Sequence, residues 1–283
     1  MRLPTNNSNY DKALSILSWG SALTILLLFF IIVGNITWQG IDQLTWQFIV
    51  DNPEDAGRQG GIAPMLVSTL LLLFFALVIA LPIGLLTAVY LAEYSNSQQR
   101  ISQWIKLTLN TLAAVPSIVM GMFGFAFFVV VLKLGFSILA GSLTLAIMIL
   151  PLLIRNIEDS IRSIPTSYRL NALSLGLSKR KTILHVLIPL AKQGIVIATI
   201  LSVGRAMAET AALLFTSGYV MRMPESLMDS GRSLSVHIFD LSMNVPGGEA
   251  PAYGSATVLL ILLLTINIIT TQIGKGLIRK GIT

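Results

Sequence analysis

The chain has 283 residues, of which 54% are hydrophobic and only 11% are charged, and its formal net charge is +6. Soluble domains carry about 25% charged residues, so this composition predicts a membrane protein. The absence of cysteine and the presence of only two histidines exclude disulfide scaffolds, thiolate metal sites, cysteine nucleophiles and a histidine-based metal cluster.

Six segments are apolar over the length that a membrane-spanning helix needs, which is about 20 residues. In chain order they are 15–37, 64–92, 106–132, 137–155, 191–217 and 254–276. The first is a full span in length and has no small-residue cleavage site behind it, so we expect a retained helix rather than a signal peptide. Six spans place both termini on the same side of the membrane.

The basic residues are distributed unequally between the two sides. The side that holds the termini carries most of them, including Lys179, Arg180 and Lys181, whereas the other side carries only Arg58, Lys133, Arg222 and Arg232. By the positive-inside rule, both termini are predicted to be cytoplasmic. The positive net charge is therefore a topology signal, and we expect no nucleic-acid partner.

Prolines and glycines interrupt the second and third predicted spans. Pro82 lies in the second span, and Pro116 and Gly121 lie in the third. Kinked and broken helices are common beside the substrate path of transporters, but small residues also permit close helix packing. The sequence alone leaves a gating role and a packing role open.

Two loops on the outer side are long. Residues 38–63 are polar, acidic and rich in turn formers, whereas Ser233 to Leu241 in the loop 218–253 are apolar enough to predict a short helix packed against the bundle. His237 lies in this stretch, where packing or contact with a binding protein is expected rather than catalysis.

The cytoplasmic segment 156–190 predicts two short helices joined by a glycine. Pro165 suits the first turn of a helix, Gly176 is placed to end it, Ser178 is placed to cap the next one, and Pro189 is expected to break or redirect the chain into the fifth span. Such a unit has a shape that fits a partner's groove, but the basic run 179–181 also suits attachment to anionic lipid. No nucleotide-binding P-loop pattern occurs, so any ATP would be bound by another subunit.

The fifth span contains Arg205 and Glu209 within the apolar stretch GRAMAETAALLFTSG. A charged side chain at that depth costs about 2.5–3.5 kcal/mol on the most lenient scale. The two residues either neutralise each other as a structural pair or line a substrate path. For an anionic substrate, the planar arginine fork would bind oxyanion oxygens and the glutamate would weaken the positive field enough to permit release.

The cytoplasmic segment NALSLGLSKRKTILHVLIPLAKQGI resembles the coupling loop of type I ABC importer permeases, in which E-A-A-x-x-x-G is followed by I-x-L-P. Ala172, Gly176 and Pro189 match this pattern, while Leu170 and Asn171 stand where the family has glutamate and alanine. The resemblance implies that this segment contacts an ATPase, through Tyr168, Arg169, Leu170, Asn171, Ala172, Leu175, Gly176, Ser178 and Lys179.

The fifth-span stretch is similar to the R-A-x-G-E-T-A-P-L-L-F-T segment of PstA-type permeases, which belong to phosphate importers. Arg205, Glu209 and Thr210 match, while Ala208 and Ala212 replace glycine and proline. AAVPSIVMGMFG and SLSVHIFDLS resemble two further segments of that family. The resemblance implies that Arg205, Glu209 and Thr210 line a phosphate path.

The implied fold is an all-α integral membrane protein, a six-transmembrane-helix bundle of the type I ABC importer permease fold with a cytoplasmic coupling helix. The expected division is 1–63 for the N-terminal tail, first helix and outer loop, 64–276 for the permease domain, and 277–283 for a cytoplasmic tail.

The resemblance also implies partners and a place. We expect a homologous PstC-type permease subunit, a homodimeric ABC ATPase and an outer-side phosphate-binding protein, assembled in the lipid of the cytoplasmic (inner) membrane of a prokaryote. The chain itself is expected to bind no cofactor and to be no enzyme, with ATP and Mg²⁺ held by the ATPase. The alternatives are a permease for sulfate, molybdate or tungstate, a self-sufficient anion channel or carrier, and, most remotely, a membrane enzyme.

Overall fold

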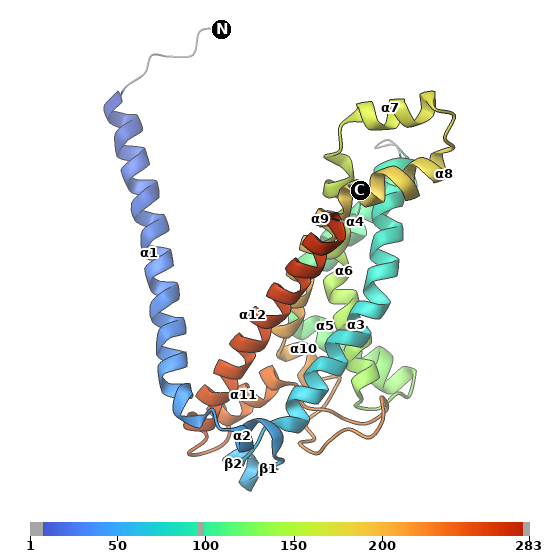
Figure 1. Ribbon diagram of the computed structural model, residues 1–283. Coiled ribbons are helices and arrows are strands. Elements are labelled where there is room, and N and C mark those ends of the chain that lie inside the picture. The colour runs from blue at the N-terminus through green and yellow to red at the C-terminus, as the bar shows by residue number, and fades with distance from the viewer. Residues whose placement is uncertain (1–7, 96–98, 280–283) are drawn as a thin grey trace.

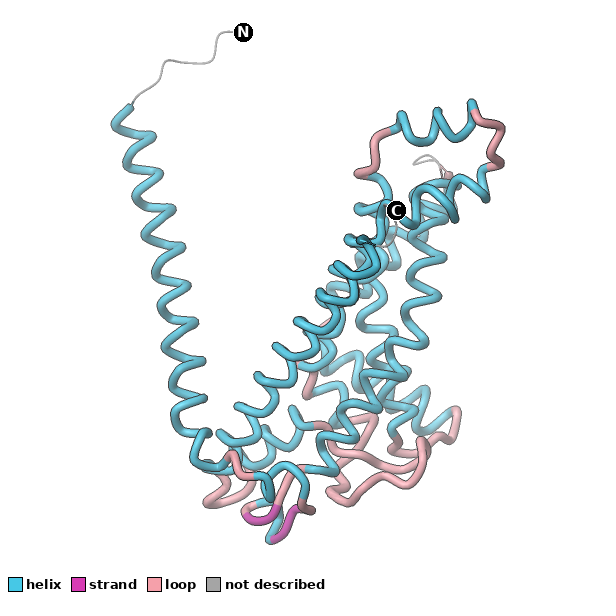
Figure 2. Tube along the Cα trace, in the orientation of Figure 1, coloured by secondary structure: helices cyan, strands magenta, loops and turns pink. Residues whose placement is uncertain are grey.

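The computed structural model describes residues 8–95 and 99–279. Residues 280–283, which form most of the predicted tail 277–283, lie outside this part. Almost all of the described chain is helical, as Figure 2 shows. Helices are expected here because a lipid environment offers no water to the backbone, so each N–H and C=O must be paired within its own segment.

In the described part, five helices are long and apolar enough to cross a membrane, or six if one bent pair is a single span. Predicted spans one, two, four and six correspond to helical runs over Leu14–Gln43, Ala63–Tyr94, Ile138–Arg162 and Glu249–Gln272. These runs belong to α1 (Ser8–Gly40), α3 (Ala63–Val89) with the π-helical η3 (Tyr90–Tyr94), α6 (Ile138–Arg162) and α12 (Glu249–Arg279). The α-helical fold class is confirmed.

The third predicted span is not one straight helix. It consists of α4 (Arg100–Ala114) and α5 (Ser117–Gly124), and α5 continues as the π-helical η4 (Phe125–Val131). The two halves are bent by 105° at Pro116. Proline has no N–H and disfavours helical geometry in the residue before it, and Val115 is accordingly extended. The predicted interruption at Pro116 is confirmed, whereas a continuous helix over 106–132 is wrong.

The other two prolines do not interrupt their helices. α3 runs through Pro82 without a break. Pro189 stands at the start of α9 (Ile188–Met207), which continues α8 (Lys179–Thr182) and the π-helical η5 (Ile183–Leu187) as one span from Lys179 to Met207. The π-helical turn η5 lies directly before Pro189, and such a turn shifts the backbone hydrogen bonds so that the helix continues past the missing N–H. The predicted interruptions at Pro82 and Pro189 are therefore wrong.

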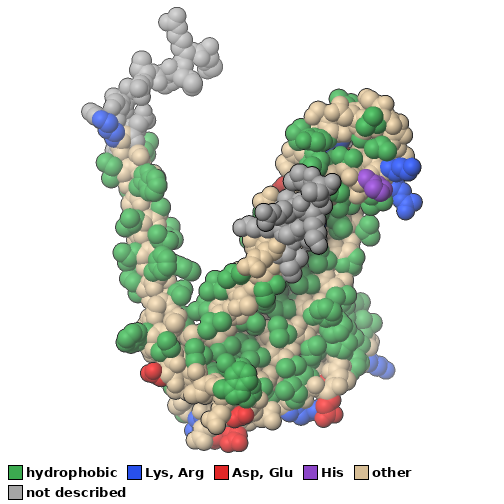
Figure 3. Space-filling view, in the orientation of Figure 1, with side chains coloured by type: hydrophobic (Ala, Val, Ile, Leu, Met, Phe, Trp, Pro, Cys, Tyr) green, Lys and Arg blue, Asp and Glu red, His purple; other side chains and the backbone are tan. Residues whose placement is uncertain are grey.

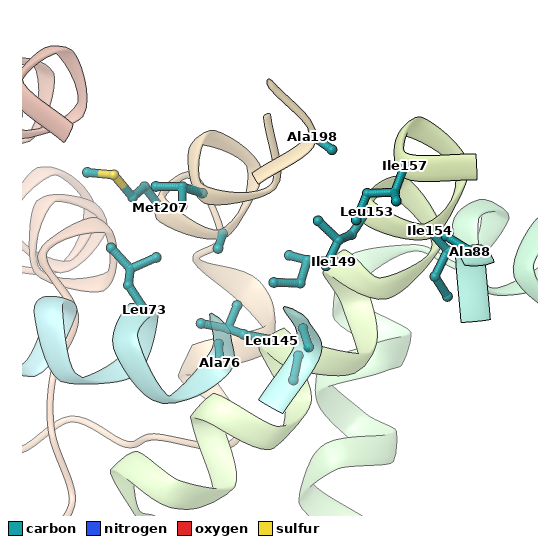
Figure 4. Packing of buried hydrophobic residues seen from close by; sticks show 14 of the residues in the cluster. Leu73, Ala76, Ala88, Leu145, Ile149, Leu153, Ile154, Ile157, Ala198 and Met207 are labelled. Atoms are coloured by element: carbon teal, nitrogen blue, oxygen red, sulfur yellow. The ribbon is translucent and has the colours of Figure 1, made fainter. Parts of the chain in front are cut away.

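α6 forms the centre of the bundle, between α3 and α9 (Figure 4). Its residues Leu145, Ile149, Leu153 and Ile157 recur at helical spacing, and each is at most 1% exposed. Gly84 of α3 lies where a Cβ would approach Leu153 Cδ2 to 2.8 Å, so this glycine permits the close packing of the two helices.

The end of the bundle opposite to α7 (Thr166–Ser174) carries the short elements (Figure 1). They are η1 (Ile41–Gln43), α2 (Trp46–Val50), η2 (Asp55–Gly57), an antiparallel pair of strands β1 (Pro53–Glu54) and β2 (Gln59–Gly60), and α11 (Leu234–Met243). The short helix predicted over Ser233–Leu241 is confirmed. The Ser233 hydroxyl caps it by accepting a bond from Val236 N at 3.3 Å, and Leu234, Val236 and Leu241 are fully buried.

α1 stands apart from the rest of the bundle along most of its length (Figure 1). Its large apolar side chains are exposed, as Leu14 at 64% and Phe30 at 63% illustrate. Figure 3 shows the same apolar surface along the flanks of the molecule, with charged side chains gathered toward its two ends. In Figure 1, the N-terminal end of α1 and the C-terminal end of α12 both point to the end that carries α7 (Thr166–Ser174).

Candidate functional site

The fifth span ends earlier than predicted, inside the stretch that carries the two charges. α9 stops at Met207, Ala208 forms a turn, Glu209 and Thr210 are non-helical, and the short α10 (Ala211–Leu214) follows. The prediction of one helix over 191–217 is therefore wrong at this point. Arg205 lies in the last turn of α9, and Glu209 lies in the break beyond it.

Tertiary contacts hold the break in place. The Ser235 hydroxyl of α11 donates to the Glu209 carbonyl oxygen at 2.7 Å, and Glu209 N donates to the Ala206 carbonyl oxygen at 3.2 Å. On another side, Gly121 of α5 lies so near α10 that a Cβ there would come within 2.8 Å of Ala212 Cα. The predicted site residue Gly121 thus acts in packing, directly behind the break.

Arg205 and Glu209 are brought together, but loosely. Arg205 Nη2 lies 3.6 Å from Glu209 Oε1, which is beyond hydrogen-bond distance. The arginine side chain is 44% exposed, whereas the glutamate side chain is 11% exposed. A guanidinium has five N–H donors, so this cation keeps its capacity to bind an anion. Thr210, the third predicted path residue, is half-buried and stands at the start of α10, where its carbonyl accepts from Leu214 N at 3.0 Å.

A cavity of about 320 Å³ lies between the broken third span and α6, and Arg205 is part of its lining. One buried water needs about 10–15 Å³, so the space admits a small anion together with several waters. The lining contains three cations and two acids among apolar side chains: Lys106, Leu109, Asn110, Ala113, Met148, Pro151, Leu152, Arg155, Glu158, Asp159 and Arg205.

In the segment 156–190 the two predicted helix ends are confirmed, while the second helix continues into α9 without the predicted break at Pro189. α7 follows Pro165, and Gly176, with φ +74°, ends it in a Schellman motif in which Leu177 N donates to the Ala172 carbonyl oxygen at 3.0 Å and Gly176 N donates to that of Leu173 at 2.9 Å. Ser178 caps α8 through Lys181 N at 3.4 Å.

Most of the predicted contact residues of this segment point outward. Tyr168, Leu170 and Leu175 are 47%, 58% and 80% exposed, and Asn171, Gly176, Ser178 and Lys179 are exposed as well, whereas Ala172 is buried. Lys179 Nζ lies 4.7 Å from the centre of the Tyr94 ring. The unit of α7 and α8 therefore exposes apolar side chains on α7 and basic side chains at Lys179–Lys181.

Arg169 differs from its neighbours because it faces the bundle. Its guanidinium donates four hydrogen bonds: two to Glu93 Oε1 at 2.6 and 2.9 Å, one to the Ile164 carbonyl oxygen at 2.7 Å and one to that of Ile161 at 2.9 Å. Glu93 stands in η3 at the end of the second span. Sequence reasoning did not single out Glu93, since 76 residues separate it from its partner and no local pattern marks the pair.

His237 of α11 is fully buried, and neither ring nitrogen has a hydrogen-bond partner among the described residues. Burial, followed by the positive charge of Arg232, lowers its pKa to about 3. A neutral buried ring fits the packing role, which was one of the two alternatives expected for His237.

Residues 80–280 match the family described as the binding-protein-dependent transport system inner membrane component. The phosphate transport system permease protein PstA 1 of Mycobacterium tuberculosis is 35% identical over 76% of this chain and 70% of its own length. The chain belongs to this permease family, in its PstA-type branch.

A second relative of this permease is the probable ABC transporter permease protein YqgI of Bacillus subtilis, 32% identical over 92% of both chains. A bacterial ABC transporter for import of the acidic polysaccharide alginate has the same fold, with a TM-score of 0.65 and 11% identity over 95% of this permease and 99% of that chain. The expected type I ABC importer permease fold is confirmed, and this permease is a multi-pass membrane protein of a binding-protein-dependent system.

Proposed function

We propose that this chain is the PstA-type half of an ATP-driven importer that moves inorganic phosphate across the cytoplasmic membrane. The observation that carries the proposal is the guanidinium of Arg205, which is loosely held, exposed, and part of the lining of a cavity in the bundle. Relatives named as phosphate transport permeases over most of the chain support phosphate over sulfate, molybdate or tungstate.

Arg205 attracts the anion, and the surrounding groups prevent it from being trapped. A guanidinium fork matches two oxygens of a phosphate. Glu209 is close enough to reduce the local positive field, and the C-terminal end of α9 adds its own partial negative charge of about half an elementary charge. Phosphate therefore binds transiently, as transport requires.

The remaining surfaces suit the expected partners. The exposed side of Arg205 and its cavity would face a homologous PstC-type permease, so that the path runs between the two chains. The exposed surface of α7 and α8 would contact a homodimeric ABC ATPase, which holds ATP and Mg²⁺. A phosphate-binding protein would deliver its cargo to the outer loops.

The orientation and domain division follow from the same proposal. The end that carries α7 is cytoplasmic, together with both termini, as the basic residues of Lys179–Lys181 support. Residues 64–276 form the permease domain proper, and 1–63 add the first helix and an outer loop.

ATP-driven uptake in vesicles tests the proposal. The vesicles hold this chain with its candidate sister permease and ATPase, the binding protein is supplied outside, and labelled phosphate is compared with sulfate and molybdate. ATP-dependent uptake of phosphate is expected. Preferential uptake of another oxyanion would overturn the substrate, and uptake without ATP would overturn the importer class in favour of a self-sufficient channel or carrier.

A further inference from the structure

Beyond Arg205, the cavity contains a second group of cations. Arg155 on α6 and Lys106 and Asn110 on α4 line the same space. Arg155 lies seven residues before the end of α6, about 10 Å along the helix axis. It therefore stands between the level of Arg205 and the end of the bundle that carries α7.

Arg155 is held only weakly by its own chain. The side chain is exposed, and its Nη2 donates to Asn110 Oδ1 at 3.0 Å. This partner is a neutral amide, so it positions the guanidinium without neutralising it. Arg162, on the same helix, is bound differently: its Nε donates to Glu158 Oε1 at 2.8 Å and its Nη2 to the Leu91 carbonyl oxygen at 2.6 Å.

The acids of the cavity do not cancel its positive charge. Glu158 is already paired with Arg162, which lies outside the lining, and Lys106 Nζ is farther from the same oxygen, at 3.5 Å. Arg205 has Glu209 beside it, which leaves Asp159 as the remaining acid in the lining against the two cations Lys106 and Arg155. The cavity therefore presents an excess of positive charge to whatever enters it.

We propose that Arg155, positioned by Asn110 and assisted by Lys106, forms a second anion-binding station on the cytoplasmic side of Arg205. The proposal rests on the proposed function, since it takes the anion to be phosphate. Two stations of moderate strength allow an anion to leave the first by binding the second, because conduction requires sites that are favourable to enter and weak enough to leave.

Phosphate binding to the permease itself tests the station. The sister permease, this chain and the ATPase are purified together in detergent without binding protein and without ATP, and bound labelled phosphate is measured by equilibrium dialysis. Arg155→Gln is expected to weaken binding and to slow ATP-driven uptake by about tenfold, as the loss of a charge-assisted hydrogen bond implies. Arg155→Lys retains the charge without the fork, so a smaller loss is expected.

Two further variants separate a binding role from a structural one. Asn110→Asp leaves Arg155 in place but puts a carboxylate beside it, and it is expected to weaken phosphate binding as Arg155→Gln does. Arg100→Gln removes an exposed arginine at the start of α4, outside the cavity lining, and is expected to change neither quantity. Basal ATPase activity and recovery of the assembled complex report folding in each case.

The outcomes distinguish this inference from the proposed function. Wild-type phosphate transport with unchanged binding in Arg155→Gln and Asn110→Asp would overturn the second station and leave the proposed function standing. An equal loss in Arg100→Gln would overturn it too, because general surface charge would then explain the effect. A failure of wild-type vesicles to transport phosphate would overturn the proposed function, irrespective of the variants.

Discussion

Two arginine–glutamate pairs in this permease are built from the same residue types and are held in opposite ways. Arg169 donates four hydrogen bonds to Glu93 and to two carbonyl oxygens, and its side chain is 21% exposed. Arg205 lies 3.6 Å from Glu209 and is 44% exposed.

The difference shows how a charge that supports the fold is distinguished from one that is free to act. A guanidinium whose donors are used by its own chain fixes the position of an element, here α7 against η3 and the end of α6. A guanidinium with unused donors beside a cavity keeps its binding capacity for something else. Residue type and burial of the acid alone do not separate the two cases, because Glu93 and Glu209 are 10% and 11% exposed.

The largest effect on stability is expected at the saturated pair. Arg169→Ala leaves the Glu93 carboxylate without its cation and removes one donor each from the Ile161 and Ile164 carbonyl oxygens, which costs about 3 kcal/mol. The thermal unfolding midpoint of the purified permease pair should fall clearly, and less complex should assemble. Arg180→Ala is the matched control, since Arg180 is exposed on α8 and its side chain meets no partner among the described residues. Equal midpoints for the two variants would contradict the structural role of Arg169.

Arg205→Gln should lower phosphate uptake strongly and stability only slightly. The pair is long, at 3.6 Å, and its arginine is 44% exposed, so the stability change is expected to stay within about 1 kcal/mol. Uptake of phosphate should fall by about tenfold to a hundredfold, because the anion loses a charge-assisted hydrogen bond. Uptake rates and unfolding midpoints measured on the same preparations check this. If both quantities fell together, Arg205 would be a structural residue like Arg169.

Gly121→Ala disturbs the break without touching either charge. A methyl group there would press on the backbone of α10 near Ala212, and such overpacking costs about 1–3 kcal/mol. Uptake should fall as the position of Glu209 shifts. Gly204→Ala provides the comparison, since nothing lies within 4 Å of that position and alanine favours the helix. Uptake in Gly121→Ala that matched Gly204→Ala would show that the break tolerates displacement.

The smallest effect is expected for Glu209→Gln. Removing one charge of a loose pair changes the interaction by at most about 1 kcal/mol, or about fivefold in rate. Phosphate should leave the stronger positive field more slowly, so the maximal uptake rate should fall, and the defect should shrink at high salt. A faster maximal rate would show that the glutamate does not assist release.

Local patterns predicted a large part of this structure. The apolar runs predicted the spans, and Pro116 predicted the break in the third. Gly176 and Ser178 predicted the end of α7 and the start of α8. Each of these signals acts within a few residues. The end of α9 carries no such signal. It is held by Ser235 from α11 and by the approach of α5 to Ala212, which are contacts between distant parts of the chain.

The same reasoning explains what was found and missed among charged residues. Arg205 was noticeable because its neighbours in sequence are apolar, whereas Arg169 stands in a polar segment and its partner Glu93 lies in another span. The family resemblance placed Arg169 among the residues that contact the ATPase, whereas in the structure it faces the bundle. The apolar composition predicted the spans. Which charged side chains are tightly paired depended on contacts between helices that are far apart in the sequence, so no local pattern predicted it.

The position of α1 has a consequence for how the chain is made. Its described contact with the bundle involves α12: Thr257 Oγ1 donates to the Tyr253 carbonyl oxygen at 2.9 Å and also lies 3.3 Å from the Ile36 carbonyl oxygen, 221 residues away in the sequence. Gly40 leaves no room for a Cβ against Tyr253 and Thr257. α1 therefore leaves the ribosome well before α12, the helix that it contacts. At about 5–20 residues per second, synthesis of the intervening chain takes about 10–40 s. During that time α1 lacks its contact with α12. A helix that is apolar on all sides is stable in lipid without that contact.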